Sequence, residues 1–150
     1  MVKRLDDNHP ALLDHVGWRL WRVSGQWKEA FEAGMRARGY PWFGEARSNV
    51  IAHLERNGIR QKELVKRMGL SKQAVQQLVD ELVVDGLVER RPDLADKRGN
   101  IVAFTRAGLA MLADANDVKL SIEASYRRKL GASGFRELMR ALRTLDAEDG

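Results

Sequence analysis

The sequence predicts a mainly helical fold with one small β-hairpin. Apolar residues recur at steps of three and four over most of the 150 residues, which is the period of amphipathic helices. Two short alternating runs, 87–90 and 101–104, depart from that period and suit paired strands. The polar loop between them, 91–100, contains a proline and a glycine, as a turn between strands requires. The hairpin therefore lies between helical regions.

The helix in front of the hairpin has both of its ends marked in the sequence. Ser71 is a natural N-cap, because its hydroxyl can accept a hydrogen bond from a free N–H of the first turn. Gly86 can adopt the left-handed conformation that ends a helix. The apolar side chains between them form one stripe: Val75, Leu78, Val79, Leu82 and Val83. The opposite face is polar and shows Lys72, Gln73, Gln76, Gln77 and Asp80.

A shorter helix precedes this one. Residues 60–68 carry enough apolar positions for two helical turns, and Gly69 and Leu70 form the short turn of a helix-turn-helix. Followed by a hairpin, such a pair predicts a winged helix-turn-helix, whose second helix enters the major groove of DNA. Ile59 is expected to add a strand stub beside the wing.

Helices flank this unit on both sides. Pro10 suits a first turn, and periodic apolar residues predict a long helix from Pro10 that ends before Gly39. A short helix is expected over 47–56, and a second long helix begins after Thr105 and breaks at 131–134. We expect one domain, residues 1–150, with a winged helix-turn-helix lobe at about 44–104 and dimerisation helices at about 10–38 and 105–146.

Several short segments carry a resemblance to a known family. The wing signature Asp96-Lys97-Arg98 is followed at a fixed spacing by Phe104-Thr105-Arg106-Ala107-Gly108. The preceding segments are Glu63-Leu64-Val65, Gly69-Leu70-Ser71, 75–82 and Asp85-Gly86-Leu87-Val88-Glu89-Arg90. With these segments, residues 61–108 resemble the MarR family (multiple antibiotic resistance regulators) of bacterial transcription factors. Many of its members carry Thr-Arg where this chain has Gln76 and Gln77, so the family's operator preference does not transfer.

Composition agrees with this reading. A formal net charge of +5 and a pI near 9.8 favour an anionic partner such as nucleic acid. The absence of cysteine excludes disulfides, zinc-thiolate sites and thiol-based sensing. The three histidines show no metal-ligand spacing, so we expect no metal and no cofactor. Without a signal peptide pattern or a membrane-length apolar stretch, the expected location is the cytoplasm, in association with the nucleoid.

The polar face of the second helix predicts contacts with double-stranded DNA. Ser71, Lys72 and Gln73 lie at the helix N-terminus, where free N–H groups and the helix dipole favour a phosphate. Gln76 and Gln77 lie one turn further, and glutamine can bind adenine with two hydrogen bonds. Plain solvation is the alternative for either glutamine.

The hairpin predicts a second set of contacts. Arg98 at its tip can enter a narrow A·T-rich minor groove, where the negative potential is strongest. Asp96 is expected to orient Arg98 or to tie the wing to the helix. Lys97, Arg90 and Arg91 are expected to bind phosphates.

The terminal helices need a partner for their apolar stripes. A twofold homodimer would cover them and would read two halves of a pseudo-palindromic operator. The resemblance implies the same arrangement, and an intramolecular helical cap is the alternative. The expected interface residues are Leu13, Val16, Leu20, Phe135, Leu138, Met139, Leu142 and Leu145.

The resemblance also implies a cleft for a small aromatic effector between the dimer helices and the lobe. Trp18 falls off the main stripe of its helix, so it faces either a partner or a pocket. Packing at the dimer interface is the alternative for these aromatic residues. The candidate ligand-binding residues are His15, Trp18, Trp21, Arg22, Tyr40 and Trp42.

No catalytic motif is present: the sequence has no nucleophile elbow, no phosphate-binding glycine loop and no metalloprotease motif. We therefore expect a regulator rather than an enzyme, namely a homodimeric repressor released by a small molecule, without a membrane partner. The alternative is a winged-helix adaptor that binds proteins and has no specific DNA target.

Overall fold

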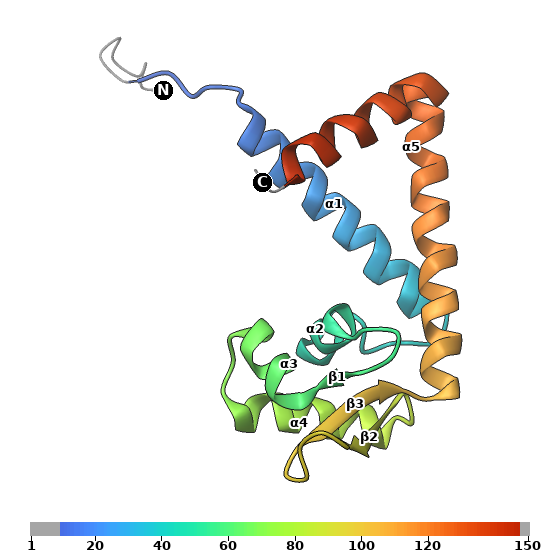
Figure 1. Ribbon diagram of the computed structural model, residues 1–150. Coiled ribbons are helices and arrows are strands. Elements are labelled where there is room, and N and C mark those ends of the chain that lie inside the picture. Colours follow the sequence, from blue (N-terminus) through green and yellow to red (C-terminus); the bar gives the residue numbers. More distant parts are fainter. Residues whose placement is uncertain (1–9, 148–150) are drawn as a thin grey trace, which may run out of the picture.

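The structure is a computed structural model that describes residues 10–147, and it has two parts (Figure 1). Two long helices and the folded-back end of the second form a three-sided frame, and a compact lobe lies at the frame's lower corner. The frame consists of α1 (Val16–Ala37) and α5 (Arg106–Asp146). The lobe consists of α2 (Ala46–His53), β1 (Ile59–Arg60), α3 (Gln61–Met68), α4 (Lys72–Val84), β2 (Val88–Pro92) and β3 (Asn100–Phe104). The predicted fold class, mainly helical with a small hairpin wing, is confirmed.

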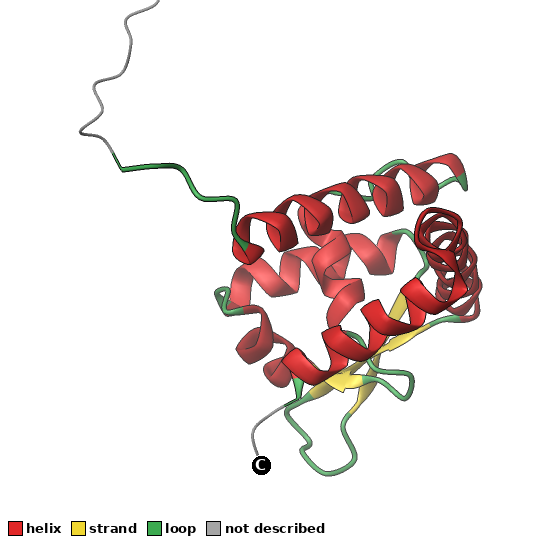
Figure 2. Cartoon of the chain, turned by 90° about the horizontal axis from the view of Figure 1, so that it is seen from above, coloured by secondary structure: helices red, strands yellow, loops and turns green. Residues whose placement is uncertain are grey.

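The three strands form one antiparallel sheet in the order β1-β3-β2. Strand β3 lies in the middle, with Ile59 of β1 opposite Val102 and with Val88 of β2 opposite Phe104. The predicted strand stub at Ile59 is therefore present. Seen from above, the strands lie at the edge of the helical layer, and the loop that joins β2 to β3 projects from it (Figure 2).

The lobe has one hydrophobic core, built from α2, α3, α4, the sheet and α5, with Met35 from the end of α1 and with Trp42 and Phe43 from the segment that follows it. Of the apolar stripe predicted for α4, Val75, Val79 and Leu82 are fully buried in this core and Leu78 is half-buried, whereas Val83 is exposed. Burial of this stripe sets the rotation of α4 and leaves its polar face in solvent. The other fully buried side chains are Met35, Val50, Leu64, Val88, Val102 and Met111.

The helix ends around the wing follow the predicted caps. Ser71 Oγ accepts a hydrogen bond from Ala74 N at 3.1 Å, and Gly86 has φ of 75° after the end of α4. Thr105 Oγ1 accepts from Gly108 N at 3.1 Å and donates to the Gly86 carbonyl at 2.5 Å. Thr105 therefore caps α5 and ties its start to the turn that follows α4.

The first helix begins later than its sequence predicts. The apolar period extends back to Leu13, but α1 begins at Val16, and residues 10–15 lie outside it. His15 is the N-cap, because its Nδ1 accepts a hydrogen bond from Trp18 N at 3.3 Å. The prediction of a start at Pro10 was wrong, since an apolar period alone does not satisfy the free N–H groups of a first turn.

The second long helix is broken where its glycines predict. Gly131 has φ of 76° and ψ of 165°, a conformation open to glycine, and the helix resumes after it in a new direction. The C-terminal part turns back from the long segment of α5 (Figure 1), and the view from above shows it well separated from α1 (Figure 2). Within residues 10–147 no helix is long and apolar enough to cross a membrane.

Candidate DNA-binding surface

The open face of α4 carries the polar residues that the sequence assigned to DNA. Lys72, Gln73, Gln76 and Gln77 are all exposed, while the opposite side of the helix is buried in the lobe. Ser71 lies exposed at the N-terminus of the same helix, and its hydroxyl holds the first turn. The structure therefore brings these five residues together on one exposed helix surface.

The loop of the wing is closed by hydrogen bonds within it. Across residues 93–99, Asp93 N donates to the Gly99 carbonyl at 3.1 Å, and Gly99 N donates to the Asp96 carbonyl at 2.9 Å. Asp96 Oδ1 accepts from the backbone N of Arg98 at 3.1 Å. This last bond fixes the main chain beneath the exposed Arg98 side chain, so Asp96 acts on Arg98 through its backbone.

The sequence did not single out the residue that anchors this loop. Asp93 is only 6% exposed, and its Oδ2 lies 2.9 Å from Nε of Arg60 at the end of β1. Its Oδ1 accepts a hydrogen bond from Ala95 N at 3.0 Å. A buried carboxylate needs such partners, because a charge without them is costly to remove from water. The Pro-Asp pair at residues 92–93 marks a turn in the sequence, but the partner 33 positions earlier is not visible there.

An open groove of about 520 Å³ runs between the wing and the helices of the lobe. Four cations line it, and Asp96 is the one acid among the lining residues. An excess of positive charge along a groove beside an exposed helix favours a phosphate backbone. The lining residues are Gln61, Lys62, Val65, Lys72, Gln76, Arg90, Asp96, Arg98, Gly99 and Asn100.

The five charged wing residues proposed from the sequence differ in their surroundings. Lys97 and Arg98 are exposed at the loop, as is Asp96. Arg91 is also exposed, but its Nε donates to Glu89 Oε1 at 2.7 Å. Arg90 binds Gln61 and Asp80 and is less free to meet a phosphate than the sequence suggested.

The family model described as MarR family matches residues 45–99, which span the winged helix-turn-helix. This part of the chain, residues 45–99, matches the MarR family. The resemblance seen in the sequence is confirmed, and so is the winged helix-turn-helix of a transcriptional regulator family.

Relatives agree with this assignment. The HTH-type transcriptional regulator PetP of Rhodobacter capsulatus is 27% identical over 104 residues, which is 67% of this chain and 63% of PetP. The match thus spans less than two thirds of that curated relative. The apo form of MarR from E. coli has a TM-score of 0.74 at 21% identity, over 90% of this chain and 98% of the other, and shows the common fold. CouR of Rhodococcus jostii RHA1, solved bound to p-coumaroyl-CoA, has a TM-score of 0.65 at 26% identity, over 91% of this chain and 95% of CouR.

The candidate effector residues of this chain fall into two separate groups. One group lies at the start of α1: the rings of Trp18 and Trp21 stack with centroids 5.2 Å apart, and the Arg22 guanidinium lies 6.0 Å from the Trp18 ring. Both tryptophans are exposed, and His15 caps the helix beside them. This group is an open surface within one chain.

The other group lies beyond the opposite end of α1. Trp42 is buried, with the Arg47 guanidinium 4.9 Å above its ring, and Tyr40 OH donates to Asp114 Oδ2 at 2.8 Å. Burial, helped by the Asp114 carboxylate, raises the pKa of Tyr40. At about 1.5 Å of rise per residue, the length of α1 separates Trp18 from Tyr40 by about 30 Å. The two groups therefore share no pocket within one chain.

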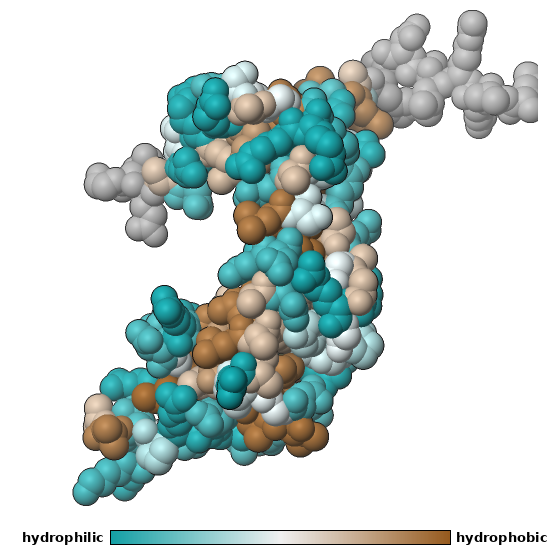
Figure 3. Space-filling view, turned by 90° about the vertical axis from the view of Figure 1, so that its right-hand side faces the viewer, coloured by the Kyte–Doolittle hydropathy of each residue, from teal (hydrophilic) through white to brown (hydrophobic). Residues whose placement is uncertain are grey.

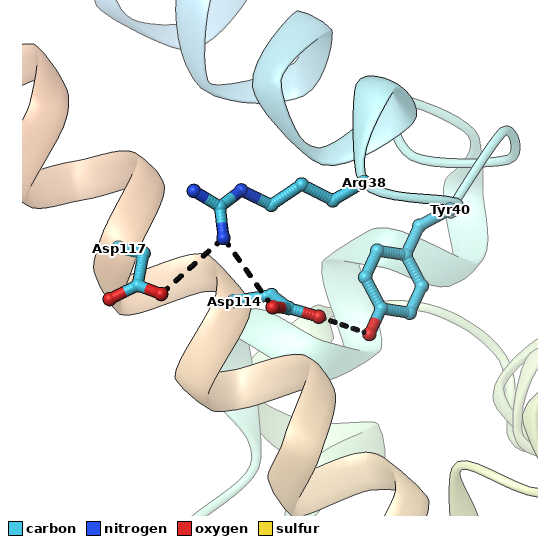
Figure 4. Close-up of polar contacts among 4 residues, drawn as sticks. All are labelled: Arg38, Tyr40, Asp114 and Asp117. Atoms are coloured by element: carbon cyan, nitrogen blue, oxygen red, sulfur yellow. Dashed lines mark hydrogen bonds and ion pairs between the residues drawn. The ribbon is translucent and has the colours of Figure 1, made fainter.

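A polar joint connects the frame to the lobe at this end of α1 (Figure 4). Arg38, the C-cap of α1, points between two acids of α5, with Nη1 at 3.5 Å from Asp114 and 3.4 Å from Asp117. Tyr40, which follows in the chain, binds the same Asp114 from the lobe side. The helices also approach closely here, because a Cβ on Gly34 would lie 2.5 Å from Val118 Cγ1. The joint fixes the crossing of α1 and α5.

The residues predicted to form the dimer interface divide into exposed and covered ones. Leu13, Val16, Leu20, Leu142 and Leu145 are exposed large apolar side chains. Leu138 and Met139 are half-buried. Phe135, in contrast, is only 6% exposed, and the Arg127 guanidinium of the same helix lies 4.5 Å from its ring. Figure 3 shows apolar patches around the hollow between the folded-back helix and the lobe.

Proposed function

We propose that this MarR-family protein is a sequence-specific DNA-binding regulator of transcription that acts as a homodimeric repressor. The observation that carries the proposal is the exposed polar face of α4 beside a groove lined by four cations. An adaptor for proteins would more often present an apolar patch there. In the proposed complex, Ser71, Lys72 and Gln73 bind phosphates, and Gln76 and Gln77 read base edges in the major groove.

The wing completes the proposed recognition. Arg98 enters an A·T-rich minor groove, and Asp96 holds the loop that presents it. Lys97 and Arg91 lie beside it for the phosphate backbone. The lobe, residues 44–104, is thereby the DNA-binding unit, and the protein is expected to act in the cytoplasm on the nucleoid.

The exposed apolar side chains of the frame support a dimer. The first half of α1 has no buried residue, although it carries leucine, valine and tryptophan side chains. A second copy related by a twofold axis would cover the terminal segments of both chains, residues 10–38 and 105–146. Two lobes held in this way read the two halves of a pseudo-palindromic operator.

The proposed effector is a small aromatic molecule that releases the dimer from DNA. The stacked Trp18 and Trp21, with Arg22 beside them, offer aromatic faces and one positive charge. CouR, a protein of similar fold, was solved bound to p-coumaroyl-CoA. A ligand that favours a lobe spacing unsuited to DNA lowers the operator affinity by the difference of its own affinities for the two states.

Specific binding is tested by fluorescence anisotropy across a salt series. The probe is a duplex that the wild-type protein selects from a random-sequence pool, and a scrambled duplex is the control. We expect binding of one dimer to the selected duplex at least about a hundredfold tighter than to the scrambled one, with a steep loss of affinity as salt rises. Failure to enrich any sequence, or equal affinity for both duplexes, would reject a sequence-specific regulator.

The dimer is tested by placing charge on the exposed face of α1. We expect Leu20→Glu to produce monomers at micromolar concentration, because a carboxylate would have to be buried without a partner. Sedimentation velocity gives the mass of the wild type and the variant. Val84→Glu is the matched control, since Val84 is as apolar and more exposed but lies on α4 in the lobe. A monomeric wild type, or a dimeric Leu20→Glu, would contradict the proposed interface.

A further inference from the structure

Arg90 joins three elements of the lobe. It lies on β2, and its Nε donates to Gln61 Oε1 on α3 at 3.0 Å. Its Nη2 donates to the backbone carbonyl of Gln76 on α4 at 3.3 Å, and its Nη1 lies 2.6 Å from Asp80 Oδ1, also on α4. One guanidinium therefore contacts both helices of the helix-turn-helix and the base of the wing.

The geometry of these bonds constrains the recognition helix in two ways. Gln76 and Asp80 are four residues apart, so they lie one above the other on the same face of α4. A rigid planar group that holds two points on one face opposes both sliding of α4 along the wing and rotation of α4 about its axis. Guanidinium suits this task, because its donors have a fixed fork geometry that the lysine ammonium lacks.

The same bonds remove Arg90 from the cations that are free to meet DNA. Its side chain is only 24% exposed, and all three nitrogens have partners. A phosphate could reach only the second N–H groups of Nη1 and Nη2 and would share the guanidinium with the carboxylate of Asp80. The exposed cations of the groove, Lys72 and Arg98 among them, need no such sharing.

We propose that Arg90 and Asp80 are positioning residues that set the angle at which Gln76 and Gln77 meet the base pairs. The inference rests on the proposed DNA-binding function and deepens it, since it assigns the source of specificity to a contact within the protein. A bidentate hydrogen bond to a base edge is sensitive to helix orientation, whereas attraction to the phosphate backbone is not.

The direction in which Asp80→Asn changes DNA affinity tests this inference. Its carboxylate lies on the helix proposed to enter the major groove and is half-exposed, so it should repel the phosphate backbone. If Asp80 acted only through its charge, Asp80→Asn would strengthen DNA binding. If Asp80 holds Arg90, the same substitution weakens binding to the specific sequence.

The experiment compares four variants of the full chain: Asp80→Asn, Arg90→Ala, the double variant and Glu89→Gln. Glu89→Gln is the matched control, because Glu89 is also a half-exposed acid beside the wing but binds Arg91 and not Arg90. Each variant is titrated by anisotropy against the wild-type-selected duplex and the scrambled duplex at several salt concentrations. Thermal unfolding shows that each variant is folded at the assay temperature.

We expect Asp80→Asn to bind the selected duplex about tenfold more weakly and the scrambled duplex as tightly as the wild type or more so. Glu89→Gln should bind both duplexes at least as tightly as the wild type. Arg90→Ala should weaken specific binding without lowering the salt slope. The double variant should bind no more weakly than Arg90→Ala alone, because both changes remove one interaction.

Two results would overturn the inference while leaving the proposed function intact. One is tighter or unchanged binding of Asp80→Asn to the selected duplex. The other is a fall of about one in the salt slope for Arg90→Ala, which would make Arg90 a phosphate contact. A wild type without preference for either duplex would overturn the proposed function itself, and the inference with it.

Discussion

Gly108→Ala is expected to destabilise the protein by about 3 kcal/mol, the upper part of the usual cost of overpacking a core. A Cβ at this position would clash with the carbonyl oxygen of Leu87 and would lie 3.0 Å from the Phe104 ring. The Leu87 oxygen cannot move aside freely, since it accepts a hydrogen bond from Thr105 N at 3.1 Å. The start of α5 would have to lift from the sheet.

Urea unfolding at a fixed protein concentration measures this change, and a fixed concentration is needed because a dimer gains stability by mass action. Gly25→Ala is the matched control. Gly25 lies inside α1 with no atom near its missing Cβ, so the alanine should stabilise the helix by about 0.5–1 kcal/mol. If Gly108→Ala unfolded at the same urea concentration as the wild type, the close packing of α5 on Leu87 would be wrong.

Arg98→Ala is expected to weaken binding to the selected duplex by about 10- to 100-fold, which corresponds to the 1–3 kcal/mol of a base-contacting arginine. The physical reason is the loss of a guanidinium that Asp96 and the closed loop present to a minor groove. The variant should also lose preference for A·T pairs at the positions beneath the wing. Anisotropy with duplexes that carry G·C pairs at those positions measures both effects.

Arg128→Ala serves as the control for Arg98→Ala. Arg128 is an exposed cation near the break of α5, far along that helix from the lobe, so its loss removes the same charge without touching the wing. Its effect on affinity should be small at physiological salt, where screening acts over about 8 Å. Equal affinity of Arg98→Ala and the wild type would favour an adaptor that binds proteins.

The elements that the sequence predicted well are those that local chemistry determines. Ser71, Gly86 and Thr105 each act on residues within a few positions or on the next turn, so their roles are readable from the chain. The break at Gly131 belongs to the same class, as does the pairing of the wing strands. The start of α1 was missed because a histidine ring, rather than a hydroxyl or a carboxylate, supplies its cap.

The polar contacts of the candidate site were harder to predict, because their partners lie far apart in the sequence. The Arg60–Asp93 pair and the Arg90–Asp80 pair each join residues of different elements. In a linear pattern Arg90 and Arg91 look alike, and only the fold shows that Arg90 faces the helices. The separation of the candidate effector residues into two groups, in contrast, follows from the length of α1 alone. Trp18 lies near the start of this helix, and Tyr40 follows its end.

The joint at Arg38, Asp114 and Asp117 holds the C-terminal end of α1 beside the lobe, so a displacement of its N-terminal end would rotate the helix about this point. The free start of α1 lies about 27 Å from the crossing at Gly34, at about 1.5 Å of rise per residue. A sideways displacement of about 3 Å at that start would turn a rigid helix by about 6° about this crossing. In the proposed dimer, small changes where two chains meet would therefore become rotations of the lobes.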